Sequence, residues 1–456
     1  MEQKREWPID GIGVEGRGSK WFEVRVHPFK RSGIAAAILI ASLLATNVTG
    51  IRAAALRSAP AADPAVITAW NETAVATIVT DAGKANAEAF LWYAYEQAAV
   101  YNAVVGITGR YELYKWDVRG PRRASPEAAA AAAAHRVLLT YFPASEERLS
   151  AAYAASLAQV PDGHAKQQGI RYGNRAARRI IRLRADDGRF ADVTFDEPLA
   201  PGVWRPTPPL FAPFFDPWLA QVEPFLLRSP SQFRPTGPPA LTSEKYEEEF
   251  EEVRDYGAKT GSLRTAEQTE TALFFSDIGV GPVQASLRDL VTRRHMDISD
   301  SARLFAAVDM SLADAVVVSW DSKLHFGFWR PVTAIQLAND DGNPETDAVP
   351  GWEPLIVTPP YPEYTSGLTT NIGALSRVLS RLLGDGRVDL NITSVASGLP
   401  GPPLTRHYGF ARRLNRDVVD ARVWSGVHFR TADVVGSAMG KQVGDWALDH
   451  YFQPTD

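Results

Sequence analysis

The chain has 456 residues, of which 45% are hydrophobic and 22% charged, and this balance is typical of a folded globular protein rather than a disordered one. The formal net charge of -5 lacks the basic excess that is typical of proteins that bind nucleic acid, so any anion site must be local. The sequence contains no cysteine, which excludes disulfides, thiolate metal ligands and cysteine nucleophiles.

An uncharged segment lies between Arg31 and Arg52 near the N-terminus. Its centre, residues 34–45, is almost entirely apolar, basic residues precede it, and small-residue triplets follow it. This order is typical of a secretory signal, and a stretch of roughly 20 uncharged residues is also long enough to span a bilayer. We therefore expect residues 1–61 to be a leader that is cleaved or kept as a membrane anchor. The protein is then exported, either secreted or held at the outer face of the cell membrane.

The chain after residue 61 has the pattern of helices separated by proline-rich loops. Between residues 82 and 104 apolar side chains recur every three or four positions, which predicts a helix with a buried face. Residues 125–127 (Ser-Pro-Glu) form a helix start signal ahead of an alanine-rich run. Basic and apolar residues alternate at helical spacing over residues 167–183, which predicts another helix.

Residues 198–239 combine many prolines with aromatic side chains and are too apolar for a flexible linker. We expect an ordered loop over the surface. Helical patterning returns at residues 244–252 and 265–275, where the acidic run is typical of a solvated helix face. The change from the proline-rich loop back to helical patterning divides the chain after the leader into two parts: an N-terminal helical region with the loop, residues 62–240, and a C-terminal helical bundle, residues 241–456.

Three segments of the C-terminal region carry residues suited to chemistry, and each adjoins a predicted core helix. The first runs from Lys323 to Pro331. If it is helical, Lys323 and Arg330 lie two turns apart on one face, so two cations share one target. Pro331 predicts that this helix ends at about Arg330. Two solvated basic residues would give the same pattern, so this segment alone does not identify a site.

The second segment, residues 359–368, is a proline-rich loop that ends with Ser366 and Gly367 at a helix start. A helix N-terminus offers backbone N–H groups and a positive dipole end, and the serine adds a hydroxyl, which together suit an anion. A purely structural N-cap would explain the serine equally well.

The third segment, residues 421–433, supplies Arg422, His428 and the carboxylate of Asp433. An imidazole whose second ring nitrogen is held by a carboxylate can bond a phosphorus or vanadium centre through the first. Because the three segments bring cations, a Ser-Gly turn and a histidine into one third of the chain, we predict a pocket that holds one tetrahedral oxyanion, phosphate or vanadate.

This ordered set resembles the superfamily of vanadium-dependent haloperoxidases and type 2 phosphatidic acid phosphatases. The superfamily pattern is Lys-x6-Arg-Pro, then Pro-Ser-Gly-His, then Ser-Arg-x5-His-x3-Asp. The chain matches the first element fully, has Thr365 where the second has proline, and in the third has Ala421 for serine and Asp433 one place later. Most of the chain after the leader also resembles the exported bacterial haloperoxidase-like branch, at residues 70–71, 98–104, 125–127, 185–188 and 201–206.

The resemblance implies an all-α fold of two packed helical bundles, with the active-site pocket in the C-terminal bundle. His428 would be the axial ligand of the metal, and Asp433 would orient its ring. Lys323 and His428 would be the catalytic residues. The oxyanion would be bound by residues from all three segments: Lys323, Arg330, Ser366, Gly367 and Arg422.

Leu368 stands where the family has its acid–base histidine. Leucine cannot transfer a proton, and such transfer typically contributes about 10²–10⁴ in rate. We therefore expect oxyanion binding to survive while catalysis is weakened. His407, in the predicted loop of residues 402–410, and Glu363, just before the Ser-Gly turn, are the candidate substitutes.

The expected function is a haloperoxidase-like activity in which bound vanadate lets hydrogen peroxide oxidise a halide or a small organic substrate, with phosphate as a competing occupant. Two alternatives stay open: a phosphate-ester hydrolase of the acid phosphatase type on the same residues, and a non-catalytic oxyanion-binding homologue. We expect no nucleic-acid partner, and contact with a membrane only through an uncleaved leader. The identity of the halide, the loading of vanadate in the cell and the formation of a homodimer are left open by the sequence.

Overall fold

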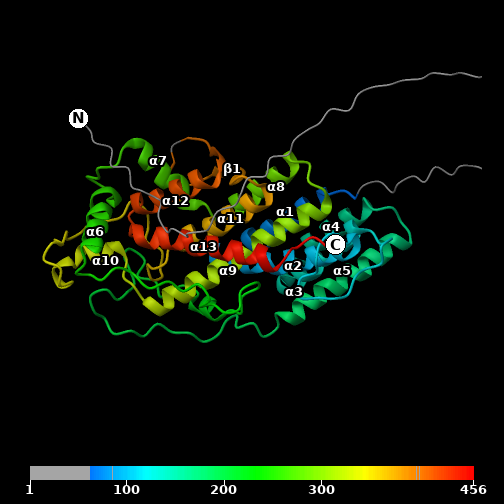
Figure 1. Ribbon diagram of the computed structural model, residues 1–456, viewed down its shortest axis with the longest axis horizontal. Coiled ribbons are helices and arrows are strands. Elements are labelled where there is room, and N and C mark those ends of the chain that lie inside the picture. The colour runs from blue at the N-terminus through cyan, green and yellow to red at the C-terminus, as the bar shows by residue number, and fades with distance from the viewer. Residues whose placement is uncertain (1–61, 85, 397, 400, 456) are drawn as a thin grey trace, which may run out of the picture. The chain divides into compact units, whose positions relative to one another are not determined.

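The computed structural model describes residues 62–455 apart from residues 85, 397 and 400 (Figure 1). Contacts within the chain separate residues 1–59 from a compact unit of residues 60–456. The predicted leader therefore lies outside the described residues. Among the described residues, no helix is both long and apolar enough to cross a membrane.

The described residues contain thirteen α-helices and a single two-stranded hairpin, so the predicted all-α class is confirmed. Five helices precede the proline-rich loop: α1 (Ala65–Val75), α2 (Asn86–Thr108), α3 (Pro126–Tyr141), α4 (Glu146–Ala158) and α5 (His164–Leu183). The other eight follow it: α6 (Glu244–Gly257), α7 (Ala266–Phe274), α8 (Val280–Arg293), α9 (Ile298–Phe326), α10 (Pro331–Gln336), α11 (Gly367–Leu383), α12 (Ala411–Trp424) and α13 (Arg430–His450).

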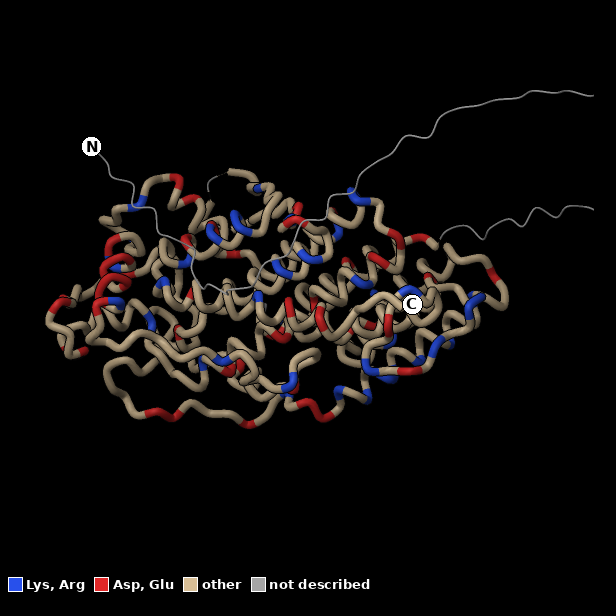
Figure 2. Tube along the Cα trace, in the orientation of Figure 1, with Lys and Arg blue, Asp and Glu red and all other residues tan. Residues whose placement is uncertain are grey.

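Helices α3 and α5 show how the sequence sets the N-terminal packing. The predicted cap is present, because the Ser125 hydroxyl accepts a hydrogen bond from Ala128 N at 3.0 Å and Pro126 occupies the first helical position. A Cβ on Gly173 of α5 would lie 2.1 Å from Ala129 O, so only glycine lets the two backbones approach so closely. The opposite face of α5 is exposed and basic, and Figure 2 shows blue positions along this helix.

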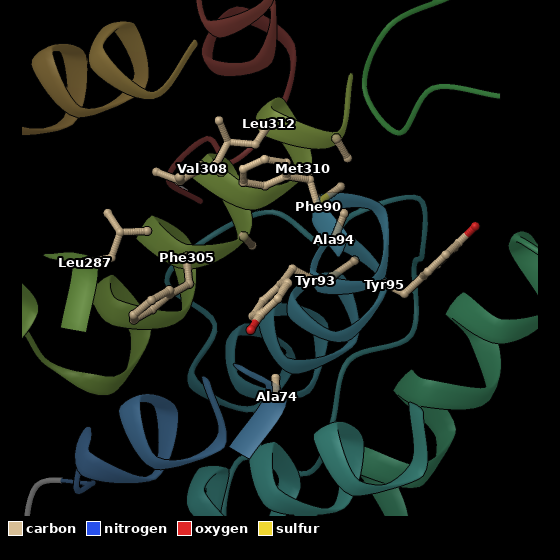
Figure 3. Close-up of a cluster of buried hydrophobic side chains, with 14 of the residues drawn as sticks. Ala74, Phe90, Tyr93, Ala94, Tyr95, Leu287, Phe305, Val308, Met310 and Leu312 are labelled. Atoms are coloured by element: carbon tan, nitrogen blue, oxygen red, sulfur yellow. The ribbon is translucent and has the colours of Figure 1, made fainter. Parts of the chain in front are cut away.

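Helix α9 packs against both α2 and α11 and therefore links the first helices to the last ones. Figure 3 shows apolar side chains of α2, α8 and α9 meeting in one cluster, with Phe90, Leu287 and Phe305 among them. Burial of such side chains is the main stabilising term of the fold. The domain boundary that we predict between residues 240 and 241 stays a prediction.

The proline-rich segment is ordered, as expected, and a buried carboxylate attaches it to α9. Asp314 accepts hydrogen bonds from the backbone N–H groups of Phe225, Leu226 and Leu227 at 2.6, 2.8 and 3.0 Å. The indole N–H of Trp320 also donates to Phe215 O at 3.2 Å. These bonds hold the loop against the same helix that carries Lys323.

The prediction that one helix runs from Lys323 to about Arg330 is wrong. Helix α9 ends at Phe326, and Gly327 follows in the left-handed region with φ +53°, donating its N–H to Lys323 O at 3.0 Å. Pro331 then starts the separate helix α10, for which Arg330 is the extended N-cap residue. Lys323 and Arg330 therefore reach the site from two helices and not from one face.

Residues 402–410, which we predict to be a loop, are largely a strand. Strand β2 (Leu404–Phe410) pairs antiparallel with β1 (Arg387–Ser394), with Asn391 opposite His407. Buried and more exposed positions alternate along β1, which is the signature of a strand with one covered face.

Two close contacts between α11 and α13 fix the part of the bundle that carries the candidate site. A Cβ on Gly440 would lie 1.9 Å from Thr370 O, and one on Gly373 would lie 2.4 Å from Ser437 O. Glycine at both positions lets the two helices touch along their backbones. Their N-terminal ends, with Ser366 and Asp433, are thereby held side by side.

Candidate oxyanion site

Arg330 joins the three predicted segments. Its side chain is fully buried, and it donates from Nε to Tyr361 O at 2.8 Å and from Nη1 to Val427 O at 2.8 Å. Nη1 also lies 3.2 Å from Nε2 of His428. One guanidinium from the first segment thus contacts the second and the third, which brings the sequence-predicted cations and the histidine into one place.

Glu363, and not Asp433, orients His428. Nδ1 of His428 lies 2.9 Å from Oε1 of Glu363, and the same oxygen accepts the N–H of Phe429 at 3.0 Å. Because Oε1 acts as an acceptor, the imidazole carries its proton on Nδ1, and the unprotonated Nε2 accepts a hydrogen bond from Nη1 of Arg330. The predicted orienting role of Asp433 is wrong, since Glu363 occupies Nδ1 of His428 and neither carboxyl oxygen of Asp433, in the first turn of α13, has a hydrogen-bond partner.

Lys323 is fully buried at the end of α9 and makes contacts that the sequence did not indicate. Its ammonium donates to the carbonyl oxygens of Pro362, Glu363 and Thr365 at 2.8, 3.1 and 2.5 Å. Lys323 therefore holds the Ser-Gly loop in place. Burial, followed by the nearby charge of Arg330, depresses the pKa of this ammonium well below its usual range.

Tyr361 is a member of the site that the sequence analysis missed. Its ring lies 4.9 Å from Lys323 Nζ and 4.9 Å from the guanidinium carbon of Arg330, so one aromatic face contacts two cations. The only signal in the sequence is its place between the prolines of the second segment. The carbonyl of Val427, another partner of Arg330, had no signal at all.

Ser366 and Arg422 complete the group of donors. Ser366 is the buried N-cap residue of α11, and Gly367 begins the helix. The backbone N–H of Ser366 donates a hydrogen bond to Ala432 O at 3.1 Å. Arg422 reaches the site from the last turn of α12 and is only 6% exposed. The charges of Lys323, Arg330 and Arg422 thus act on His428 from three different helices or their caps, while Ser366 and Gly367 begin α11 beside Ala432.

The donor set fits a tetrahedral oxyanion. Buried polar atoms in native proteins are almost always satisfied, so a group of unsatisfied ones indicates a missing polar guest. Donors without a partner are well suited to the oxygens of phosphate or vanadate. Within the described residues, the buried side-chain atoms of the three segments that lack a hydrogen-bond partner are Trp329 Nε1, Arg330 Nη2, Glu363 Oε2, Thr365 Oγ1, Ser366 Oγ, Arg422 Nε and both carboxyl oxygens of Asp433.

Burial shifts the titration of the acids and of the histidine toward their neutral forms. It raises the pKa of Glu363 to about 8, against the opposing charges of Arg330 and Lys323. It also raises the pKa of Asp433 well above its usual range, with Ser366 and Arg422 opposing the rise. Burial, together with Arg330 and Arg422, lowers the pKa of His428. With both acids neutral, the guanidinium groups of Arg330 and Arg422 give the site a net positive charge that attracts an anion, and His428 is neutral, as a ligand atom requires.

The two candidate substitutes for the missing histidine have different positions. His407 is exposed on β2, where its Nδ1 lies 2.9 Å from Asn391 Oδ1 of the same hairpin, so the prediction that it replaces the histidine is wrong. Glu363 lies in the site but is bonded to His428. Leu368 is half-buried and packs against the main apolar cluster, which leaves no proton-transfer group at that position.

The same site region matches a known family. Residues 303–456 match the family model described as the VCPO second helical-bundle domain. The vanadium chloroperoxidase of Curvularia inaequalis is 29% identical over 175 residues, which are 29% of this chain and 28% of that relative's length.

Two solved structures share the fold over most of both chains. One is the first bacterial vanadium-dependent iodoperoxidase, with a TM-score of 0.72 and 23% identity over 86% of this chain and 98% of that chain. The other is a holo-type bacterial vanadium-dependent chloroperoxidase, with a TM-score of 0.65 and 20% identity over 86% of this chain and 97% of that chain.

Proposed function

We propose that this chain, which belongs to the vanadium haloperoxidase superfamily, binds vanadate and acts as a haloperoxidase-like protein that is weakened by Leu368. The observation that carries the proposal is the contact of the Arg330 guanidinium with His428 Nε2, at 3.2 Å, amid buried donors without partners. A metal oxyanion needs this combination of hydrogen-bond donors and one unprotonated imidazole nitrogen.

The residues that would hold the oxyanion follow from the unsatisfied atoms. Nη2 of Arg330, Nε of Arg422 and the hydroxyls of Thr365 and Ser366 can donate to its oxygens. Nε2 of His428 would be the ligand to the metal. Bound vanadate would supply a Lewis-acidic centre that activates hydrogen peroxide toward halide.

The remaining site residues position these groups and set the charge. Glu363 keeps the proton of His428 on Nδ1, so that Nε2 stays available. Lys323, through three carbonyl contacts, fixes the loop that presents Thr365 and Ser366. The charges of Arg330 and Arg422 stabilise negative charge on the oxyanion in this buried site.

A non-catalytic oxyanion binder is the alternative that a specific observation favours. Leu368 provides no proton transfer, and the carbonyl contacts of Lys323 use all three of its N–H groups. Neither feature interferes with charge attraction or with the donors of the arginines. A phosphate-ester hydrolase on the same residues would use His428 as the nucleophile, but it would need a proton donor for the leaving group.

Adding vanadate separates these functions. Purified protein is assayed for iodide and bromide oxidation by hydrogen peroxide and for hydrolysis of a phosphate monoester, with and without vanadate. The proposal expects halide oxidation that depends on vanadate and is lost in His428→Ala, while His407→Ala, a matched change at an exposed histidine, has no effect. Phosphatase turnover that vanadate inhibits would favour the hydrolase. Thermal stabilisation by vanadate with neither activity would favour the binder.

We also propose that the protein works outside the cytoplasm, with the leader of residues 1–61 cleaved or retained. The supporting observation is the order of basic, apolar and small residues in the sequence. Fractionation of the producing cells, with N-terminal sequencing of the recovered protein, tests this and distinguishes cleavage from anchoring.

A further inference from the structure

The exposed face of helix α5 carries a row of arginines. Arg171, Arg175, Arg178 and Arg182 are all exposed and are spaced by four, three and four residues, which places them on one line along the helix. The row spans about 16 Å at 1.5 Å per residue. The opposite face of α5 is buried and consists of small and apolar residues with one tyrosine.

The row is unusual because nothing neutralises it. None of these four side chains forms a hydrogen bond or an ion pair with another residue in the part of the chain that the structure describes. By contrast, Arg293 and Arg294 at the end of α8 both form ion pairs with Asp389. Helix α5 contains one lysine, five arginines and no acidic residue, in a chain whose net charge is -5.

Like charges three and four residues apart on a helix repel each other and destabilise it. An ordinary solvated helix face mixes both signs, as the salt bridge between Arg293 and Asp289 within α8 illustrates. The fold therefore retains a local electrostatic cost along α5. A partner that brings negative charge to this face would remove that cost.

Two contacts extend the basic face toward the N-terminal end of the described chain. Ser125 N donates to Ala165 O at 3.0 Å, so the exposed Arg122 and Arg123 lie on the loop that adjoins the start of α5. Asp63 N donates to Glu127 Oε1 at 3.2 Å, in the first turn of α3. The start of the described chain is therefore attached at this end of α3.

We propose that the face formed by Arg122, Arg123, Arg171, Arg175, Arg178 and Arg182 binds the surface of an anionic phospholipid bilayer. Guanidinium groups form paired hydrogen bonds to phosphate oxygens, and a bilayer presents many phosphates in one plane. Between residues 171 and 182 of α5, all four exposed positions are arginines. Aromatic stacking platforms of the kind that hold single-stranded nucleic acids are not part of it. The binding does not depend on the function of the oxyanion site.

The test measures binding of the full chain to vesicles of phosphatidylcholine alone and to vesicles that also contain phosphatidylglycerol. The variant R171Q/R175Q/R178Q removes three charges from α5. The matched control R412Q/R413Q/R416Q removes three exposed charges from α12. Circular dichroism and thermal unfolding verify that both variants are folded. Wild type and both variants carry the same apolar leader, so any insertion of the leader contributes equally to all three on each kind of vesicle.

We expect wild type and the α12 variant to prefer the anionic vesicles, with a preference that falls as salt rises. The α5 variant should lose on the order of 10²-fold in partition, since each basic residue near such a surface contributes about a factor of five at low salt. Equal binding of wild type to both vesicles overturns the proposal, and so does an equal loss in both variants. Binding of duplex DNA that depends on α5, without vesicle binding that depends on α5, would instead assign the face to nucleic acid.

Discussion

Replacing Glu363 with glutamine tests the electrostatics of the oxyanion site while leaving its geometry nearly unchanged. Oε1 of Glu363 accepts from His428 Nδ1 at 2.9 Å and from Phe429 N at 3.0 Å, and the amide oxygen of glutamine can accept the same two bonds. The substitution therefore removes the ability of this side chain to ionise and keeps its size and its acceptor.

The magnitude follows from the shifted titration of Glu363. Burial raises its pKa from 4.5 to about 8, although Arg330 and Lys323 oppose the rise. Between these two values the folded protein keeps a proton that the unfolded chain has lost, so the stabilisation is present at low pH and is lost as the pH rises through 8. Since one pKa unit corresponds to about 1.4 kcal/mol, the loss amounts to up to about 5 kcal/mol.

The assay is urea unfolding of oxyanion-free protein on both sides of this window, at about pH 5 and about pH 9. Wild type and Glu363→Gln should have similar free energies of unfolding at the lower pH, where both side chains are neutral. At the higher pH the variant should be more stable by several kcal/mol. Glu353→Gln, which removes a carboxylate from an exposed ion pair with Lys259, is the control and should show no such trend. A difference between Glu363→Gln and wild type that stays constant with pH would refute the reasoning.

Three further substitutions address catalysis, ligand binding and folding. Leu368→His should raise vanadate-dependent iodide oxidation by about 10²–10⁴, because it restores an acid–base group, whereas Leu368→Ala should not; steady-state kinetics with hydrogen peroxide decide this. Arg422→Gln should weaken phosphate binding by roughly 10-fold or more in calorimetry, since it removes one buried cation from the site, while Arg412→Gln on the exposed face of the same helix should leave it unchanged. Asp314→Asn should destabilise the fold by about 2–4 kcal/mol in urea unfolding, because three backbone N–H groups lose a charged acceptor.

The sequence predicted the parts of the structure that depend on local pattern. The cap at Ser125, the helices of the first half and the ordered proline-rich loop all follow from residues that lie close together in the chain. The three segments could be brought together only through their resemblance to a family, because no local rule relates Arg330 to His428 across 98 residues. The structure supplies that relation through the guanidinium of Arg330.

The errors of the sequence analysis share one physical cause. Tertiary packing, rather than spacing along the chain, decides three features: the end of helix α9 at Gly327, the hairpin around His407, and the bond of His428 to Glu363 instead of Asp433. Gly327 illustrates this, because a Cβ there would lie 2.6 Å from the ring of Phe195, a residue that is distant in sequence. The contact between His428 and Glu363 spans 65 residues and depends on how Lys323 holds the intervening loop.

Binding and catalysis are separable in this chain because different residues carry them. The attraction for an oxyanion comes from Arg330 and Arg422, and burial strengthens it by disfavouring the charged forms of the nearby acids. None of these side chains depends on position 368, which faces apolar neighbours. Replacing the acid–base residue therefore leaves the electrostatic frame intact. An occupied site should also stabilise the fold, since an anion that binds only the folded state shifts the unfolding equilibrium by mass action.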